Sequence, residues 1–255
     1  MDDSERKTAT AASFGASAEG YRDSATHRAG EDLDRLASWC GDASRALDVA
    51  TGAGHTAGAL RDAGVARVVA ADAAPAMLAT ARETVSGLDV VAGDAERLPF
   101  AAGAFDAVTC RIAAHHFPAP EAFVADVARV LRPGGTVALE DNVAPPDDAL
   151  AQFRNRLERA RDPTHVESYR TATWHDWLRN AGFDVAETDH VVRRIEVGPW
   201  IDRIDSSEAA DEGEIRRALD AAPDHIAEAF GIEYDDGAAV AFGSRKALIR
   251  AELRE

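Results

Sequence analysis

The sequence predicts an α/β fold, a doubly wound and mostly parallel sheet of seven strands with helices on both faces and a small helical insertion before the last strand. The first observation is that short apolar runs alternate with alanine-rich amphipathic segments from residue 46 onward, which is typical of βαβ units around a buried sheet. The second is that Gly64, Gly87, Gly134 and Gly182 lie where the expected helices should end. Because crossovers between parallel strands are right-handed, these units should build an open twisted sheet.

The apolar runs and amphipathic segments give the expected elements in order. Strands are expected at 46–50, 65–72, 88–92, 105–111, 136–141 and 185–188, with 189–197 as an extension and 238–253 as the last strand. Helices are expected at 28–39, 56–62, 75–85, 120–130 and 173–181. Residues 208–230 form the expected helical insertion, with apolar markers at Ile215, Leu219 and Ile226, whereas residues 1–20 are small and polar and should be loosely structured at their start.

The composition is that of an acidic protein. The chain has 255 residues, a formal net charge of −17 and only two lysines, Lys7 and Lys246, among its 28 basic residues. Such a charge repels nucleic-acid phosphates and anionic lipid, so we expect neither nucleic-acid binding nor membrane insertion. The scarcity of lysine and the excess of carboxylates favour adaptation to high salt over an ordinary acidic surface.

The chain also lacks signals for export or metal binding. The polar N-terminus is unlike a signal peptide, so a cytoplasmic protein is expected, either a monomer or a homodimer. Cys40 and Cys110 lack metal-ligand spacing and should be buried as small apolar residues.

The strongest motif is the segment LDVATGAGHTA at 47–57, an apolar strand followed by a glycine-rich turn and a helix start. Gly52 and Gly54 allow the backbone to approach a ligand closely, as the first turn of a doubly wound sheet does. Asp48 at the end of the strand would repel a pyrophosphate and suits a ligand with a positively charged amino group. The alternative is that Asp48 only fastens its own loop.

Further acidic residues follow the next strands. Asp72 is placed to accept hydrogen bonds from two ribose hydroxyls, or alternatively to cap the helix that begins near Pro75. After the third strand, Asp94 could accept from an adenine amino group while the Ala95 amide donates to a ring nitrogen. The segment FDAVTCRI at 105–112 and the segment LRPGG at 131–135 complete the series.

These five motifs in this order resemble the class I S-adenosylmethionine-dependent methyltransferases, in particular the ubiquinone/menaquinone-biosynthesis-like (methyltransferase type 11) branch. The resemblance implies a Rossmann-like fold, S-adenosylmethionine as cofactor and S-adenosylhomocysteine as product. It further implies that the methionyl end of the cofactor is surrounded by Asp48, Gly52 and Gly54, that the ribose is held by Asp72, and that the adenine lies near Ala73 and Met77 and is bound at its edge by Asp94 and Ala95. Arg111 would close the pocket beside the methyl group, and Phe14 and Tyr21 would fold over the cofactor as a flap.

On this basis the chain, 1–255, is interpreted as a single methyltransferase domain. Residues 1–40 are expected to form a flap with helices, 41–190 the cofactor-binding core, and 191–255 the helical insertion and final strand.

Methyl transfer from a sulfonium needs positioning more than a strong catalytic group, but a base helps when the acceptor must lose a proton. His115 and His116 follow the fourth strand and are the candidates, with packing or capping as the alternative for each. Weaker candidates are His27, His165 and Tyr169, whereas His55 is expected to be structural and Trp174 and Trp177 to pack in the core. No metal site is expected, because Glu140 and Asp141 lack further ligands at readable spacing.

Two other functions are compatible with the same sheet. One is an NAD(P)-dependent oxidoreductase, and the other is a catalytically silent S-adenosylmethionine-binding protein. The acceptor is expected to be a small molecule. Phe117, Trp200 and Phe230 would supply an apolar wall for an isoprenoid-like acceptor, although core packing explains them equally well.

Overall fold

A computed structural model of the protein describes residues 2–23, 28–202 and 211–255. The central sheet has the strand order β3-β2-β1-β4-β5-β8-β6, and a short strand, β7, pairs with β8 outside this path. The strands are β1 (Arg45–Val49), β2 (Arg67–Asp72), β3 (Asp89–Ala92), β4 (Phe105–Arg111), β5 (Leu131–Asn142), β6 (Phe183–Glu196), β7 (Glu233–Asp235) and β8 (Ala238–Leu253). The seven expected strands are confirmed, and the hairpin strand β7 is an addition to them.

The sheet is parallel from β3 to β5 and becomes antiparallel at β8, which pairs with both β5 and β6. The helices are α1 (Asp3–Ala16), α2 (Ala18–Asp23), α4 (Glu31–Ser38), α5 (His55–Asp62), α6 (Pro75–Thr84), the 3-10 turn η1 (Ala114–His116), α7 (Pro120–Val130), α8 (Asp148–Arg161), α9 (Thr171–Asn180), α10 (Val197–Asp202), α11 (Glu212–Asp220) and α12 (Asp224–Phe230). The helix α8 was not predicted. The expected insertion consists of α11 and α12, and the part of the range 208–230 before residue 211 lies outside the described residues.

Two cores on opposite faces of the sheet explain why the strands are apolar throughout. Leu47 and Val49 of β1 face α7 and α9, whereas the intervening residues of the strands, such as Ala46, face α4 and α5. A parallel sheet that is covered on both faces buries every side chain of its central strands. The carboxyl ends of β1, β2 and β4 are therefore held rigidly at one edge of the sheet.

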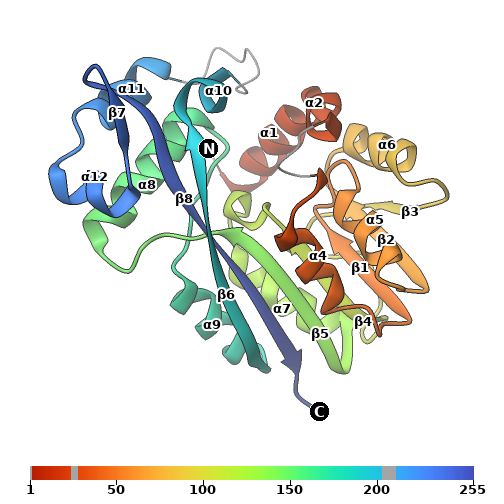
Figure 1. Cartoon of the computed structure of the whole chain (residues 1–255). Helices are drawn as coiled ribbons and strands as arrows, with labels where there is room; N and C mark the ends of the chain where they lie inside the picture. The colour runs from red at the N-terminus through yellow and green to blue at the C-terminus, as the bar shows by residue number, and fades with distance from the viewer. Residues whose placement is uncertain (1, 24–27, 203–210) are drawn as a thin grey trace.

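A third core lies beyond the end of the sheet. The strands β6 and β8 continue past β5 and carry a lobe that contains α8, α10, α11 and α12 (Figure 1). Phe153 and Trp200 belong to its apolar interior. None of the helices within the described ranges is long and apolar enough to span a membrane.

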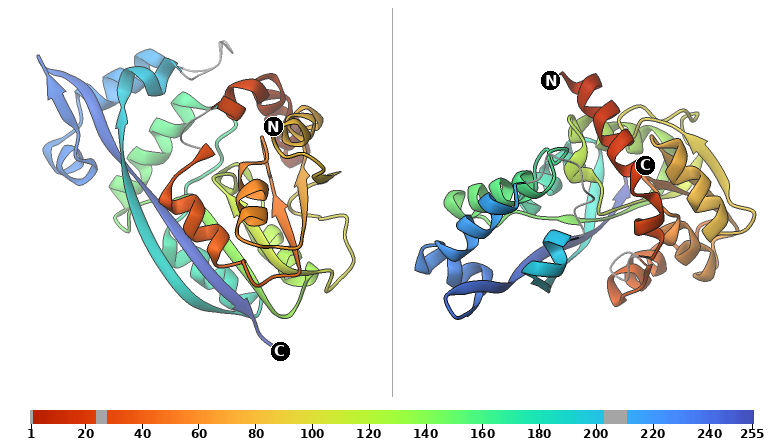
Figure 2. Two further views of the ribbon diagram at one scale, coloured as in Figure 1. Left: turned by 45° about the vertical axis from the view of Figure 1, so that its right-hand side comes forward. Right: turned by 90° about the horizontal axis from the view of Figure 1, so that it is seen from above.

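The N-terminal segment is helical, so the prediction that its start is loosely structured was wrong. The Asp2 side chain accepts from the Glu5 amide at 2.8 Å, and the Glu5 carboxylate accepts from the Asp2 amide at 2.9 Å. This reciprocal capping box starts α1 although its residues are small and polar. Both α1 and α2 pack against α6 at the carboxyl end of the strands (Figure 2).

Candidate functional site

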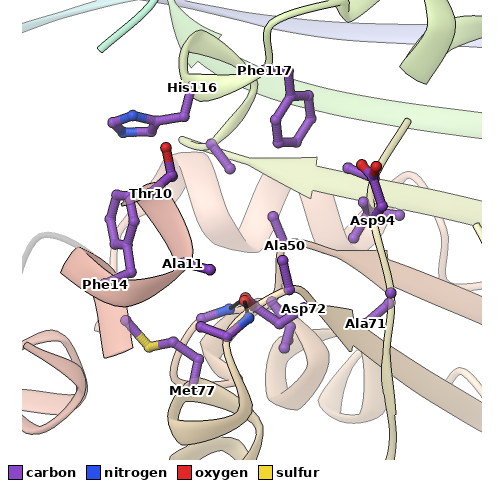
Figure 3. Close-up of a pocket in the computed structure, with 18 of the residues that line it drawn as sticks. Thr10, Ala11, Phe14, Ala50, Ala71, Asp72, Met77, Asp94, His116 and Phe117 are labelled. Carbon is purple, nitrogen blue, oxygen red and sulfur yellow. Dashed lines mark hydrogen bonds between the residues drawn. The ribbon is translucent and has the colours of Figure 1, made fainter. Parts of the chain in front are cut away.

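A cavity of about 430 Å³ lies at the carboxyl ends of β1, β2 and β4, closed on one side by α1. Its volume is in the range of pockets that hold a cofactor or drug-sized ligand. Figure 3 shows Asp72 and Met77 at one end, His116 and Phe117 at the other, and Thr10, Ala11 and Phe14 of α1 along one side. The predicted site residues that line the cavity are Phe14, Tyr21, Gly52, Asp72, Ala73, Met77, Asp94, Ala95, Arg111 and His116.

Both glycines of the glycine-rich turn have a positive φ, but only Gly52 lines the cavity. Gly52 has a φ of +53°, lines the cavity, and donates its amide to Asp72 Oδ2 at 2.9 Å. Gly54 has a φ of +87° and is not among the lining residues. A Cβ at Gly54 would lie 3.1 Å from the Ala81 backbone, so this glycine allows the turn to approach α6 closely.

Asp48 braces the turn from behind. Its carboxylate is 1% exposed and accepts hydrogen bonds from the hydroxyls of Thr51 at 2.6 Å and Thr109 at 2.8 Å. Asp48 is not among the residues that line the cavity, whose wall here is formed by its neighbours from Val49 to Ala53. Burial raises the pKa of Asp48 to about 6, and the two hydroxyls only partly offset this effect.

Asp72 is the last residue of β2, at the carboxyl end of the strand, and faces the cavity. Its Oδ1 accepts from the Ala74 amide at 2.8 Å, and its Oδ2 accepts from Gly52. Burial raises its pKa despite these bonds. A carboxylate has about four acceptor sites, so Asp72 can receive two further donors such as the hydroxyls of a ribose.

Asp94 is held by two different donors. Its Oδ1 accepts from the Glu96 amide at 2.9 Å, and its Oδ2 accepts from the Lys7 ammonium at 2.8 Å. Lys7 also forms an ion pair with Glu96, so it links α1 to the loop between β3 and β4. Lys7 and Glu96 both line the cavity and were missed by the sequence analysis. The rarity of lysine was the one signal that pointed to Lys7.

The two residues predicted to belong to a flap, Phe14 and Tyr21, lie on α1 and α2 and line the cavity. The ring of Phe14 lies edge-on to His116, with centroids 4.8 Å apart, and 5.3 Å from the ring of Tyr21. His55, which was expected to be structural, has its Nε2 3.3 Å from the Tyr21 carbonyl and also lines the cavity.

Arg111 lines the cavity and belongs to a buried cluster of charges. It donates to Glu140 at 2.6 Å and to Asp32 at 3.2 Å. Lys246 donates to Glu140 at 2.9 Å, and Arg193 donates to Asp32 at 2.5 Å. Glu140 is thus occupied by two cations. In the part of the chain that the structure describes, no three His, Cys, Asp or Glu side chains are grouped to hold a metal ion.

His115 and His116 are both buried but differ in position. His115 Nδ1 lies 2.5 Å from Asp141 Oδ1, and His115 does not line the cavity. Burial alone would lower the pKa of His115, but the Asp141 carboxylate raises it overall. His116 lines the cavity, with its Nδ1 3.2 Å from the Thr164 hydroxyl. Burial and the neighbouring His115 lower the pKa of His116 to about 4, so its imidazole is neutral near pH 7.

The remaining candidates lie away from the cavity wall. His165 is buried with its Nε2 3.0 Å from Asn155 Oδ1, and Tyr169 packs against Trp177. His27 lies outside the described residues. Of the proposed apolar wall only Phe117 lines the cavity. Trp200 and Phe230 belong to the third core, where they contact Phe242 and Phe153 respectively, and Trp174 and Trp177 pack around the main core as expected.

Comparison with known proteins is consistent with this geometry. Residues 47–139 match the family described as "Methyltransferase domain". The chain is 34% identical over 249 residues to the uncharacterized methyltransferase YcgJ of Bacillus subtilis, covering 94% of this chain and 98% of that protein. A demethylmenaquinone methyltransferase of Thermus thermophilus is 44% identical over 111 residues, covering 42% of this chain and 50% of that protein.

The fold is also similar to solved structures. The crystal structure of a putative methyltransferase from Bacillus halodurans superposes with a TM-score of 0.83 and 35% identity, covering 89% of this chain and all of that one. The structure of the Bacillus subtilis YcgJ protein has a TM-score of 0.80 and 31% identity with the same coverage.

Proposed function

The chain belongs to the class I S-adenosylmethionine-dependent methyltransferases, and from that membership we propose that it methylates a small-molecule acceptor in the cavity beneath α1. The members of this family are methyltransferases. We therefore do not pursue the two alternatives, an NAD(P)-dependent oxidoreductase and a catalytically silent binding protein. One observation supports the proposal most strongly. A single cavity joins a ribose-type carboxylate, Asp72, to a neutral histidine, His116.

The cavity residues fit the cofactor that the family uses. Asp72 has acceptor sites left for a ribose, Met77 offers an apolar surface for the adenine, and Asp94 and Ala95 lie at its outer edge. S-Adenosylmethionine supplies an electrophilic methyl group on a sulfonium and leaves as S-adenosylhomocysteine. Gly52 brings bare backbone to the cavity wall, and Asp48 behind it places a carboxylate close to where an amino group would bind.

His116 is the proposed base for an acceptor that must lose a proton. Its side chain lines the cavity, and its lowered pKa leaves a ring nitrogen free to accept a proton at neutral pH. His115 acts as its support, because the rings lie 4.2 Å apart and Asp141 holds His115 in place. Arg111 also lines the cavity, and its bonds to Asp32 and Glu140 hold its guanidinium in place.

The acceptor is proposed to be small, because the cavity must also hold the cofactor. Phe117 gives the end of the cavity beside His116 an apolar surface. Some relatives are named demethylmenaquinone methyltransferase or ubiquinone biosynthesis O-methyltransferase, so we propose quinone precursors as the first acceptors to test.

The test is calorimetric binding of S-adenosylmethionine and S-adenosylhomocysteine to the wild type and to Asp72→Asn, with Asp89→Asn as the matched control. Asp89 lies on β3, next to β2, but is exposed and is not among the cavity-lining residues. Loss of hydrogen bonds to a charged acceptor should weaken binding by about 10- to 100-fold in Asp72→Asn and leave Asp89→Asn unchanged. Wild-type protein that is folded but binds neither compound would refute the proposal. Release of S-adenosylhomocysteine with a panel of phenols, amines and thiols then distinguishes turnover from binding alone.

A further inference from the structure

Lys7 joins α1 to the opposite side of the cavity. Its ammonium lies 2.8 Å from Asp94 Oδ2 and also pairs with Glu96, both on the loop between β3 and β4. Glu96 is itself fixed, because its Oε1 accepts from the Ala119 amide at 2.6 Å. The lysine therefore binds two carboxylates that belong to the framework of the sheet and not to α1.

Little else holds α1 in this position. None of its residues is buried, and its apolar contacts are made by Ala11 and Phe14, which pack beside Ala18, Ala74 and Met77, and by the ring of Phe14 against those of Tyr21 and His116. Across the described ranges, the two ion pairs of Lys7 are the only ones that connect α1 with the rest of the chain. The closed position of α1 thus depends heavily on one side chain.

The choice of lysine at this position is informative. Only two of the 28 basic residues are lysines, and the other, Lys246, bonds Glu140 in the buried charge cluster. The ammonium of Lys7 is a compact charge with three donors, and it pairs with two carboxylates at once. Arginine predominates in the rest of the chain; Lys7 lines the cavity, whereas Lys246 is not among its lining residues.

We propose that Lys7 is a positioning residue that latches α1 over the adenine end of the bound cofactor and fixes Asp94 for recognition of the adenine edge. This inference rests on the proposed function, because it assumes that the cavity holds the cofactor. An oxygen of a carboxylate can accept two hydrogen bonds, so Asp94 Oδ2 serves Lys7 and an adenine amino group together. Because α1 forms one wall of the cavity, breaking the bridges of Lys7 should speed release of the cofactor.

The test compares Lys7→Met with Lys7→Arg and with Arg6→Met as the matched control. Methionine keeps most of the length of the lysine side chain but has no charge, and Arg6 is a neighbouring cation on α1 that forms no ion pair with the residues the structure describes. Stopped-flow release of S-adenosylhomocysteine should be about five- to tenfold faster in Lys7→Met, with a smaller change in the association rate, and unchanged in Arg6→Met. Lys7→Arg should fall in between. Added KCl should speed release from the wild type but not from Lys7→Met.

Hydrogen exchange of the α1 amides in the cofactor-free protein gives a second measurement. Lys7→Met should lower the protection of α1, whereas Arg6→Met should not. Tighter binding of S-adenosylhomocysteine by Lys7→Met would show that Lys7 competes with adenine and would overturn the latch. Equal release and equal α1 protection in Lys7→Met and Arg6→Met would overturn it too. A wild type that binds no S-adenosylhomocysteine would refute the proposed function, and the exchange measurement would still decide whether Lys7 holds α1 closed.

Discussion

The substitution Asp48→Asn should make the protein more stable near neutral pH and weaken its hold on the cofactor. Asp48 is 1% exposed, and burial raises its pKa from the ordinary value of 3.8 to about 6. Its hydrogen-bond partners are two hydroxyls rather than a cation, and together with the charge of Arg111 they offset the effect of burial on its pKa only in part. Asparagine is similar in shape, and a threonine hydroxyl can accept from its amide as readily as donate to its oxygen.

The size of the effect follows from the two pKa values. Since the folded state favours the protonated carboxyl, the wild type is most stable below about pH 4 with respect to this group. It loses stability as the pH rises through the window from 3.8 to about 6. The difference between the two pKa values corresponds to a loss of about 3 kcal/mol in the free energy of unfolding once Asp48 is ionised. Asp48→Asn removes this loss, so its stability relative to the wild type should rise by most of that amount between about pH 4 and pH 7.

The assay is urea unfolding of both proteins at a series of pH values, with Asp62→Asn as the control. Asp62 is an exposed residue at the end of α5, and its replacement should give a difference that does not vary with pH. Calorimetry at about pH 7.5 should show binding of S-adenosylhomocysteine weakened about tenfold in Asp48→Asn, because a nearby carboxylate favours the ammonium group of the ligand. A stability difference that is the same at about pH 4.5 and about pH 7.5 would refute the argument from burial. Unchanged affinity would make Asp48 only a brace of its loop.

Two further predictions concern the base and the surface charge. His116→Gln should lower kcat about 100-fold for a hydroxyl acceptor, because the pKa of about 4 leaves the wild-type imidazole unprotonated and able to accept the proton, whereas glutamine is not a base. Activity equal to that of the wild type would exclude His116 as the base. The wild-type pH profile should show no loss attributable to this group until the pH falls towards 4, since only then does His116 become protonated. The melting temperature should rise with KCl, because ions screen the repulsion among charges that sum to −17, and a melting temperature independent of KCl would remove the idea of salt adaptation.

The sequence by itself determined the sheet and the edge at which ligands bind. The apolar runs are buried on both faces, so their composition and spacing predict strands without reference to distant contacts. Asp72 ends β2 and Gly52 lies in the turn after β1. Because the ends of parallel strands meet at one edge of the sheet, their place beside the cavity could be predicted. The capping box of Asp2 and Glu5 is also a local sequence signal, but the small polar composition of residues 1–20 led to the prediction of a loose start instead.

Only the tertiary structure decided which polar groups face the cavity and which lie behind it. Asp48 lies behind the turn because Thr109, 61 residues away, donates to it from the adjacent strand. His115 and His116 are neighbours in sequence, yet Asp141 draws His115 away while His116 lines the wall. Lys7 meets Asp94 across 87 residues, and no local pattern encodes such a contact. Periodicity specifies which residues are buried, whereas the pairing of charges depends on where the chain brings its distant segments together.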